Sequence, residues 1–271
     1  MGGEGVKAVI GNGKLRLIIG SRPQGHAHVS AFTKYASEVF GGVPEELIEV
    51  VPGDTETLNY GVGTFGSRSA TVVAAAITEL AERVASRLSS MGLSLIDAIK
   101  SRDVIIEEEV DYKPSIAILA PGAHVVVVDF DPETLMANVI NYYAAYNVGK
   151  PLLEEEVEAQ LHGGILQGIA QVLWEGAIYG DDGTPLHTTL ADYGLPSPPD
   201  VTYKVLTKGL NTPSILPGGL RGIGEAGTTG ALASVFLALE KAIRAKTGIR
   251  IKLNRTPVTP SYLHSLINNQ F

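Results

Sequence analysis

The chain has 271 residues, enough to bury a sizeable core as one large domain or two packed halves. Its 21 Lys and Arg against 29 Asp and Glu give a net charge of −8, and without any basic run this argues against nucleic-acid or anionic-membrane binding. Charged residues reach only 18%, which favours a chain covered by partners. The absence of cysteine excludes disulfides, cysteine nucleophiles and iron–sulfur clusters held by this chain.

The N-terminal segment lacks the basic and apolar regions of a secretory signal. No uncharged stretch reaches the roughly 18 residues needed to span a bilayer. We therefore expect the mature chain to begin here and the protein to be soluble and cytoplasmic.

The first half of the chain predicts a hairpin, two helices and several strands. The hairpin joins residues 6–10 and 15–19 through Gly11-Asn12-Gly13, and we expect it at a sheet edge. Apolar spacing predicts helices over 28–40 and 70–88, the first ended by Gly41-Gly42. Strands are predicted at 47–51, 104–110, 116–119 and 125–130, the last turning at 131–134 into 135–144.

The second half predicts helices at 154–174, 229–246 and from Pro257, and strands around the turn 181–183 and at 201–206 and 249–253. Strands and helices interleave without a regular rhythm, which favours an α+β fold with mixed sheets and packed helices. A boundary near 101–114 would divide the chain into lobes 1–110 and 111–271 around a cleft, with one glycine-rich loop in each lobe.

The segment 60–69, YGVGTFGSRS, places three glycines and two serines just before the alanine-rich predicted helix. Amides at a helix start, glycines and hydroxyls suit an anion such as phosphate. Gly61 to Gly66 matches GxGxxG, but the dinucleotide fingerprint also needs a strand directly before it and a carboxylate about 20 residues on, and both are missing. An anion site and a plain capped helix after a flexible loop are equally open.

A second glycine-rich segment, 222–228 (GIGEAGT), carries Glu225 in an apolar loop ahead of another predicted helix. Such a loop is an unusual place for a charge, and burial there would suit a general base. The alternative is a glutamate at a helix start, favoured by the helix dipole, with Arg221 as its partner.

Two further segments carry candidate binding groups. In RPQGHAH, Gln24 has a donor and an acceptor for a ring or an oxo group, or it is an exposed turn residue. His26 and His28 have no third ligand nearby, so we predict capping or solvated histidines and no metal ligands. The helical segment 158–168, EAQLHGGILQG, holds three glycines that each cost about 1 kcal/mol relative to alanine, which indicates close contact with a neighbouring helix or a ligand.

Taken in order, QGHAH, GDT with GVGTFGSRS, EAQLHGGILQG and GIGEAGT resemble the C-terminal, molybdopterin-binding part of the large subunit of molybdenum hydroxylases. This is the family of xanthine dehydrogenase, aldehyde oxidoreductase and aerobic carbon monoxide dehydrogenase. The resemblance extends from Val6 to about Leu263 and includes GAHVVVVDFDPET and DYGLPSPPD. It implies that residues 1–271 form a molybdopterin cofactor-binding domain, with the cofactor in the cleft between the lobes.

The resemblance also implies roles for individual residues. Glu225 matches the family's glutamate, the base that deprotonates a molybdenum-bound water or hydroxide for attack on the substrate carbon. Prokaryotic members usually carry the cytosine dinucleotide form of molybdopterin, so we expect that form. The implied cofactor-binding residues are Gln24, Gly25, Gly63, Thr64, Phe65, Gly66, Ser67, Arg68, Ser69, Gln160 and Gly224.

Two features depart from the family pattern. Pro23 precedes Gln24 where many relatives have glycine, and the large subunits normally continue upstream with another cofactor-binding half. The resemblance therefore implies one subunit of a split molybdenum hydroxylase that oxidises an aldehyde or related small molecule with water as the oxygen source. A chain carrying the N-terminal half and iron–sulfur and flavin (FAD) subunits would be its partners. The alternatives are a non-catalytic scaffold or orphan fragment that only binds a partner, and a nucleotide-binding enzyme of unrelated fold, which the missing strand before Gly61 disfavours.

Overall fold

The computed structural model describes residues 2–268, which fold into two compact units. The first unit contains residues 2–121, 147–157 and 210–224, and the second contains 122–146, 158–209 and 225–268. Both are built from helices and sheets, so the predicted α+β class with mixed sheets is confirmed. The lobe boundaries 1–110 and 111–271 stay a prediction.

The sheet of the first unit contains β1 (Glu4–Gly11), β2 (Lys14–Ile19), β3 (Ile48–Pro52) and β4 (Ile106–Tyr112) in the order β3-β2-β1-β4. The predicted hairpin is β1–β2, and its turn has Asn12 and Gly13 at φ 53° and 84°, as a tight two-residue turn requires. Its predicted place at a sheet edge is wrong. β4 pairs with β1 and β3 with β2, so the hairpin is the centre of the sheet.

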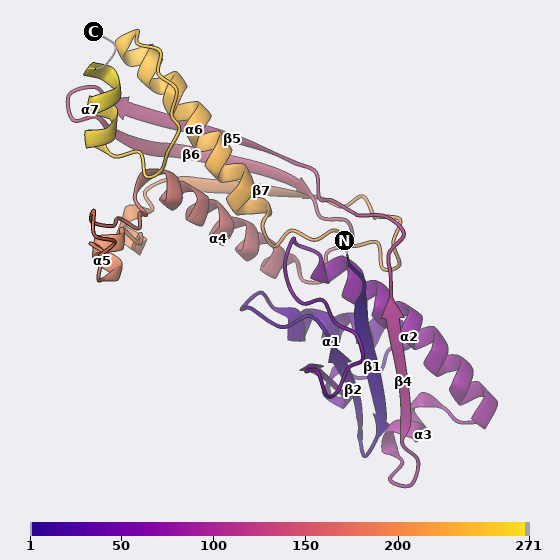
Figure 1. Cartoon of the computed structure of the whole chain (residues 1–271). Coiled ribbons are helices and arrows are strands. Elements are labelled where there is room, and N and C mark those ends of the chain that lie inside the picture. Colours follow the sequence, from indigo (N-terminus) through magenta and orange to yellow (C-terminus); the bar gives the residue numbers. More distant parts are fainter. Residues whose placement is uncertain (1, 269–271) are drawn as a thin grey trace. The chain divides into compact units, whose positions relative to one another are not determined.

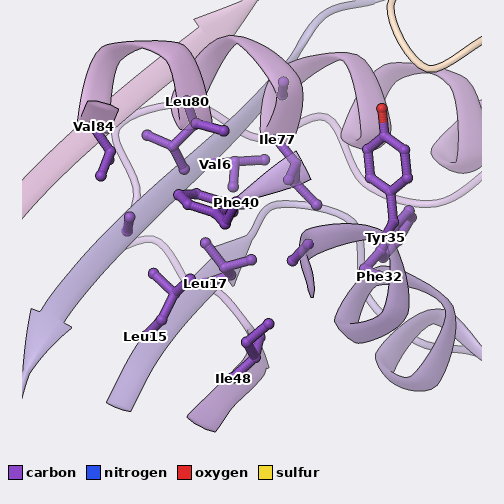
Figure 2. Packing of buried hydrophobic residues seen from close by; sticks show 14 of the residues in the cluster. Val6, Leu15, Leu17, Phe32, Tyr35, Phe40, Ile48, Ile77, Leu80 and Val84 are labelled. Carbon is purple, nitrogen blue, oxygen red and sulfur yellow. The ribbon is translucent and has the colours of Figure 1, made fainter. Parts of the chain in front are cut away.

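Helices α1 (His28–Val39) and α2 (Ser69–Met91) match the predicted helices, and their apolar residues share one buried core with the alternating inward residues of β1 and β2. The short η1 (Glu45–Leu47) and α3 (Leu95–Lys100) were not predicted. Figure 2 shows how side chains from both helices meet those of the strands. The labelled core residues are Val6, Leu15, Leu17, Phe32, Tyr35, Phe40, Ile48, Ile77, Leu80 and Val84.

The second unit has a three-stranded sheet in the order β5-β6-β7, made of β5 (Gly122–Asp131), β6 (Met136–Asn147) and β7 (Lys204–Leu210). The 22-residue α6 (Ala226–Thr247) runs along β5 (Figure 1). The other helices are α4 (Glu154–Leu173), α5 (Leu190–Tyr193), η2 (Pro198–Asp200) and α7 (Pro260–Asn268). None of the helices within residues 2–268 has the length and apolar composition needed to cross a lipid bilayer.

Three predicted strand regions are wrong. Residues 116–119 and 249–253 are loops, and the turn at 181–183 is flanked only by one isolated bridge, between Tyr179 and Pro185. Ile118 and Leu253 are nevertheless buried. These short apolar runs therefore bury side chains without joining a ladder, a distinction that hydrophobicity alone does not make.

Candidate functional site

The glycine-rich loop before α2 has an unusual backbone. β3 ends at Pro52, so a long loop separates it from α2, as the mismatch with the dinucleotide fingerprint predicted. Gly63, Gly66 and Ser67 have φ of 94°, 57° and 53°. A positive φ is uncommon for a serine, and such residues gather at functional sites. The loop thus turns sharply just before the N-terminus of a 23-residue helix, whose dipole favours an anion.

The segment containing Gln24 lies against this loop. The Gln24 side-chain nitrogen donates to the Thr64 carbonyl oxygen at 3.4 Å, and the Thr64 hydroxyl donates to the Arg22 carbonyl oxygen at 2.7 Å. Gln24 and Phe65 are exposed, the latter at 54%. The structure therefore brings together two of the predicted cofactor-binding segments, 24–25 and 63–69, on the surface of one unit.

Arg68 points inward rather than toward this surface, with its side chain only 1% exposed. Its Nη1 atom lies 2.6 Å from Glu4 Oε2 and donates to the Gly63 carbonyl oxygen at 2.6 Å. Its Nη2 atom donates to the carbonyl oxygens of Gly2 and Gly3. The guanidinium group thus joins the start of β1 to the glycine-rich loop, which is a structural task; its predicted contact with a cofactor stays a prediction.

Glu4 is the centre of the buried network beneath the loop. It is fully buried, and its Oε1 atom accepts the Val62 amide at 3.2 Å. The Ser21 hydroxyl donates to Oε2 at 2.8 Å, and the Ser69 hydroxyl lies 3.1 Å from that of Ser21. The network therefore ties β1, the segment just after β2, the glycine-rich loop and the first residue of α2 together. Ser69 is buried in it, so a cofactor contact by its hydroxyl also stays a prediction.

The sequence motifs did not identify Glu4 or Ser21 as part of the candidate site, although the strand pattern around Glu4 indicates that it is buried. In β1 it shares a face with Val6, Ala8 and Ile10, all fully buried. Because side chains alternate along a strand, the pattern already placed a carboxylate on the core face. A buried carboxylate requires a charged or hydrogen-bonding partner, which Arg68 supplies.

The second glycine-rich segment reaches the first one within the same unit. Gly222 lies so close to the loop that an added Cβ would be 1.5 Å from the Ser67 carbonyl oxygen, and one on Gly224 would be 3.7 Å from the Ser67 hydroxyl oxygen. Only glycine at position 222 allows this approach. The structure therefore assembles Gln24, residues 63–69 and Gly224 on one unit.

Glu225 follows Gly224 directly and is the N-cap residue of α6, with φ −108° and ψ −1°. Its carbonyl oxygen accepts the amide and the hydroxyl of Thr229 at 3.1 and 3.0 Å. The residue is exposed, so the burial considered for it is absent, and it stands at a helix start, as the alternative proposed. Arg221, its suggested partner, donates to the carbonyl oxygens of Thr212 and Leu119, and its pairing with Glu225 stays a prediction.

Gln160 is half-buried on α4 in the second unit. The three glycines of α4 differ in their surroundings. A Cβ on Gly164 would lie 3.0 Å from the Thr228 amide nitrogen, and one on Gly168 would lie 2.6 Å from the Ala231 Cβ, whereas one on Gly163 would meet nothing within 4 Å. Two of the three glycines are thus explained by close packing of α4 on α6, as the helix-packing alternative proposed.

His26 and His28 stack with ring centroids 3.8 Å apart. Burial and the neighbouring His26 lower the pKa of His28 to about 4, and burial lowers the pKa of His26. His28 Nδ1 is buried without a hydrogen-bond partner. Within residues 2–268, no three histidine or carboxylate side chains are grouped so that they would hold a metal ion.

Comparison with known proteins identifies the family. A profile of the molybdopterin cofactor-binding domain matches residues 5–113 and 106–202, well over half of the chain. The chain belongs to the molybdopterin cofactor-binding domain family. The predicted resemblance to the C-terminal, molybdopterin-binding part of molybdenum hydroxylase large subunits is confirmed.

Relatives and solved structures give the same result. The chain is 25% identical to the nicotine 6-hydroxylase large subunit of Paenarthrobacter nicotinovorans, over 90% of this chain and 35% of the relative. It is 26% identical to the carbon monoxide dehydrogenase large chain of Hydrogenophaga pseudoflava, over 83% of this chain and 32% of the relative. Quinoline 2-oxidoreductase from Pseudomonas putida 86 superimposes with a TM-score of 0.83 at 27% identity, covering 99% of this chain and 38% of that one. The chain thus spans about a third of the length of these relatives.

Proposed function

We propose that this molybdopterin-binding chain is a subunit of a split molybdenum hydroxylase and that Glu225 is its catalytic base. The observation that carries the proposal is the assembly of Gln24, the loop 63–69 and Gly224 on one unit, with Glu225 next in the chain. We assign cofactor binding to these segments and to Gln160. Family membership supports the cofactor, and the assembled segments support the place where it binds.

The groups on this surface fit an anionic, oxygen-rich cofactor. Cβ atoms built on Gly25, Gly63 and Gly66 would meet nothing within 4 Å, so the backbone there is open to a ligand. The exposed Gln24 amide supplies a donor and an acceptor, and the N-terminus of α2 favours negative charge. A pyrophosphate group, as in the cytosine dinucleotide form of molybdopterin, suits such a loop.

When bound, the molybdenum cofactor supplies an oxygen atom derived from water and accepts the two electrons that the substrate loses. The part of this chain is to hold that group and to move a proton. The Glu225 carboxylate takes the proton at one of its Oε atoms, and its exposure leaves it accessible to water. The proposed substrate is an aldehyde or a related small molecule.

Partner chains complete the proposed enzyme. The relatives are named as large subunits or large chains and are about three times as long as this chain. We propose that a separate chain carries the part equivalent to their N-terminal half, and that iron–sulfur and flavin subunits carry the electrons away. A cysteine-free chain holds no iron–sulfur cluster by thiolates, which supports this division. The proposed location is the cytoplasm.

Two measurements test the proposal. The native complex is purified without denaturation, and its molybdenum is quantified together with the co-eluting polypeptides; molybdenum in a fixed ratio to this chain, with iron-bearing partners, is the expected result. Glu225→Gln in the same complex should abolish turnover and leave the molybdenum content unchanged. A chain that elutes alone and metal-free would instead support a scaffold or orphan fragment, and retained turnover of Glu225→Gln would contradict the assignment of the base.

A further inference from the structure

Three aromatic side chains lie together on the face of β5 and β6 that meets α6. His124 is paired with Ala144 across the strands, so Tyr142 and Tyr146 are its two diagonal neighbours. Both tyrosine rings meet the imidazole edge-on, with centroids 5.5 and 5.2 Å away. Tyr142 and Tyr146 are buried at 0% and 6% exposure.

Hydrogen bonds connect this cluster to the start of α6. The Tyr146 hydroxyl donates to the carbonyl oxygen of Ala226, the first residue of α6, at 2.6 Å. A phenol has one proton, so toward His124 the same oxygen accepts, and His124 Nε2 must carry the hydrogen. His124 Nδ1 then accepts from the Tyr142 hydroxyl. The result is a one-directional chain of neutral groups from Tyr142 through His124 and Tyr146 to the backbone next to Glu225.

Burial favours the neutral forms of the imidazole and of the two phenols. It lowers the pKa of His124 and raises the pKa values of Tyr142 and Tyr146, so each group keeps the proton count that the chain of hydrogen bonds requires. Glu225 is exposed at the helix start, outside this cluster.

Two glycines make the arrangement possible. A Cβ on Gly230, one turn into α6, would lie 2.2 Å from His124 Nε2, so the imidazole rests directly on the helix backbone. A Cβ on Gly122 would lie 2.3 Å from the Tyr146 ring, which therefore crosses the strand at that point. A glycine inside a helix costs about 1 kcal/mol relative to alanine, and the imidazole contact explains the glycine at position 230.

We propose that Tyr146 is a positioning residue for Glu225, with His124 and Tyr142 orienting its hydroxyl. By anchoring the Ala226 carbonyl, Tyr146 fixes the first turn of α6 and with it the backbone that carries the proposed base. This inference rests on the proposed function. Positioning matters because a displacement of about 1 Å of a reacting group lowers rates by up to about a hundredfold.

The test compares Tyr146→Phe with Tyr143→Phe. Tyr143 is the matched control, since it lies on the same strand, is 41% exposed and points to the other face. In the native complex, Tyr146→Phe should lower kcat on the order of tenfold, with KM and molybdenum content unchanged. In the full chain alone, amide hydrogen exchange of residues 226–230 should rise severalfold, and the 15N signals of His124 should lose the signature of the Nε2–H tautomer. Tyr143→Phe should change none of these.

The outcomes separate the two proposals. If Glu225→Gln is inactive and Tyr146→Phe retains the wild-type kcat, the positioning role is overturned and the proposed base stands. If Glu225→Gln retains turnover, the assignment of Glu225 as the base fails and the positioning role fails with it, whatever Tyr146→Phe does to hydrogen exchange. A Tyr146→Phe complex that loses molybdenum in proportion to its activity also overturns the inference, because the residue is then only structural. Gly230→Ala, which displaces the imidazole, should reproduce the fall in kcat and the faster exchange.

Discussion

The two units support their candidate functional segments with different buried chemistry. In the first unit a charged pair, Glu4 and Arg68, lies beneath the glycine-rich loop with side chains 0% and 1% exposed. In the second unit neutral groups, His124 with two tyrosines, lie behind the start of α6. The difference matters energetically: a buried charge that loses its partner is far more costly than a neutral group that loses one hydrogen bond. The first unit should therefore be the more sensitive to single substitutions.

The largest expected loss of stability follows from breaking the buried ion pair between Arg68 and Glu4. Arg68→Met leaves the Glu4 carboxylate buried without its cation and should lower the free energy of unfolding of the first unit by about 3–5 kcal/mol. Amide hydrogen exchange in β1 measures this loss, because β1 lies in the core of that unit. Glu4→Leu combined with Arg68→Met should be less harmful than Arg68→Met alone. A loss below about 1 kcal/mol for Arg68→Met would show that the pair contributes no more than a surface contact.

The next largest effect is the pH dependence that buried His28 gives to the stability of the first unit. In the unfolded chain His28 takes up a proton when the pH falls below its ordinary pKa of 6.5. In the folded chain its pKa is about 4, so it stays neutral until the pH falls to about 4. The unfolded state then binds more protons, so stability should fall as the pH drops from 6.5 to about 4, by as much as about 3 kcal/mol. Below that range the contribution of His28 should not change further. Urea unfolding at a series of pH values measures the slope.

His28→Asn isolates the contribution of this residue and should flatten the slope between these pH values. His264, exposed on α7, provides the control, and its replacement by asparagine should leave the slope as in the wild type. An unchanged slope in His28→Asn would assign the pH dependence to other groups, of which His26 is the nearest.

Local patterns predicted much of this fold, and the failures share a cause. The β1–β2 hairpin and helices α1, α2, α4 and α6 were predicted to within a few residues, because turn residues and apolar spacing act over short stretches. The central place of the hairpin was missed because it depends on pairing of Glu4 with Tyr112, far along the chain. The loop at 249–253 was missed because Leu253 is buried without a strand partner.

The site shows the same division. The motifs predicted Gln24, the loop 63–69 and Glu225 as candidate site residues, whereas they gave no indication of the buried groups behind them. The alternation along β1 put Glu4 on the core face, and that along β5 put His124 on the same face as Val126, Val128 and Phe130. Their partners, Arg68 and Tyr146, come from other elements, so the hydrogen bonds required the three-dimensional fold.

A smaller loss of stability is expected in the second unit for Gly168→Ala, which disturbs the close packing of α4 on α6 and no buried charge. Gly168→Ala brings a Cβ within 2.8 Å of the Thr228 carbonyl oxygen, a backbone atom that yields little. Overpacking costs about 1–3 kcal/mol and the gain in helix propensity is up to about 1 kcal/mol, so we expect a net loss of about 1–2 kcal/mol. Fluorescence of Trp174, the only tryptophan, follows unfolding of this unit.

Gly163→Ala on the same helix is the matched control. A Cβ there meets nothing within 4 Å, so this substitution should stabilise the unit by about 0.5–1 kcal/mol through helix propensity alone. Equal effects of the two substitutions would show that α4 does not pack on α6 at Gly168 as tightly as the structure has it.

The smallest expected effect tests whether burial, rather than charge, makes the first unit sensitive. Arg83 pairs with Glu79 on α2 at 2.5 Å, like Arg68 with Glu4, but the two side chains are 51% and 37% exposed. Because water screens both charges and solvates either one alone, Arg83→Met should change the stability of the first unit by no more than about 0.5 kcal/mol. The same exchange measurement in β1 compares it directly with Arg68→Met. A loss as large as that of Arg68→Met would mean that net charge along α2, and not the buried network beneath the glycine-rich loop, controls the stability of this unit.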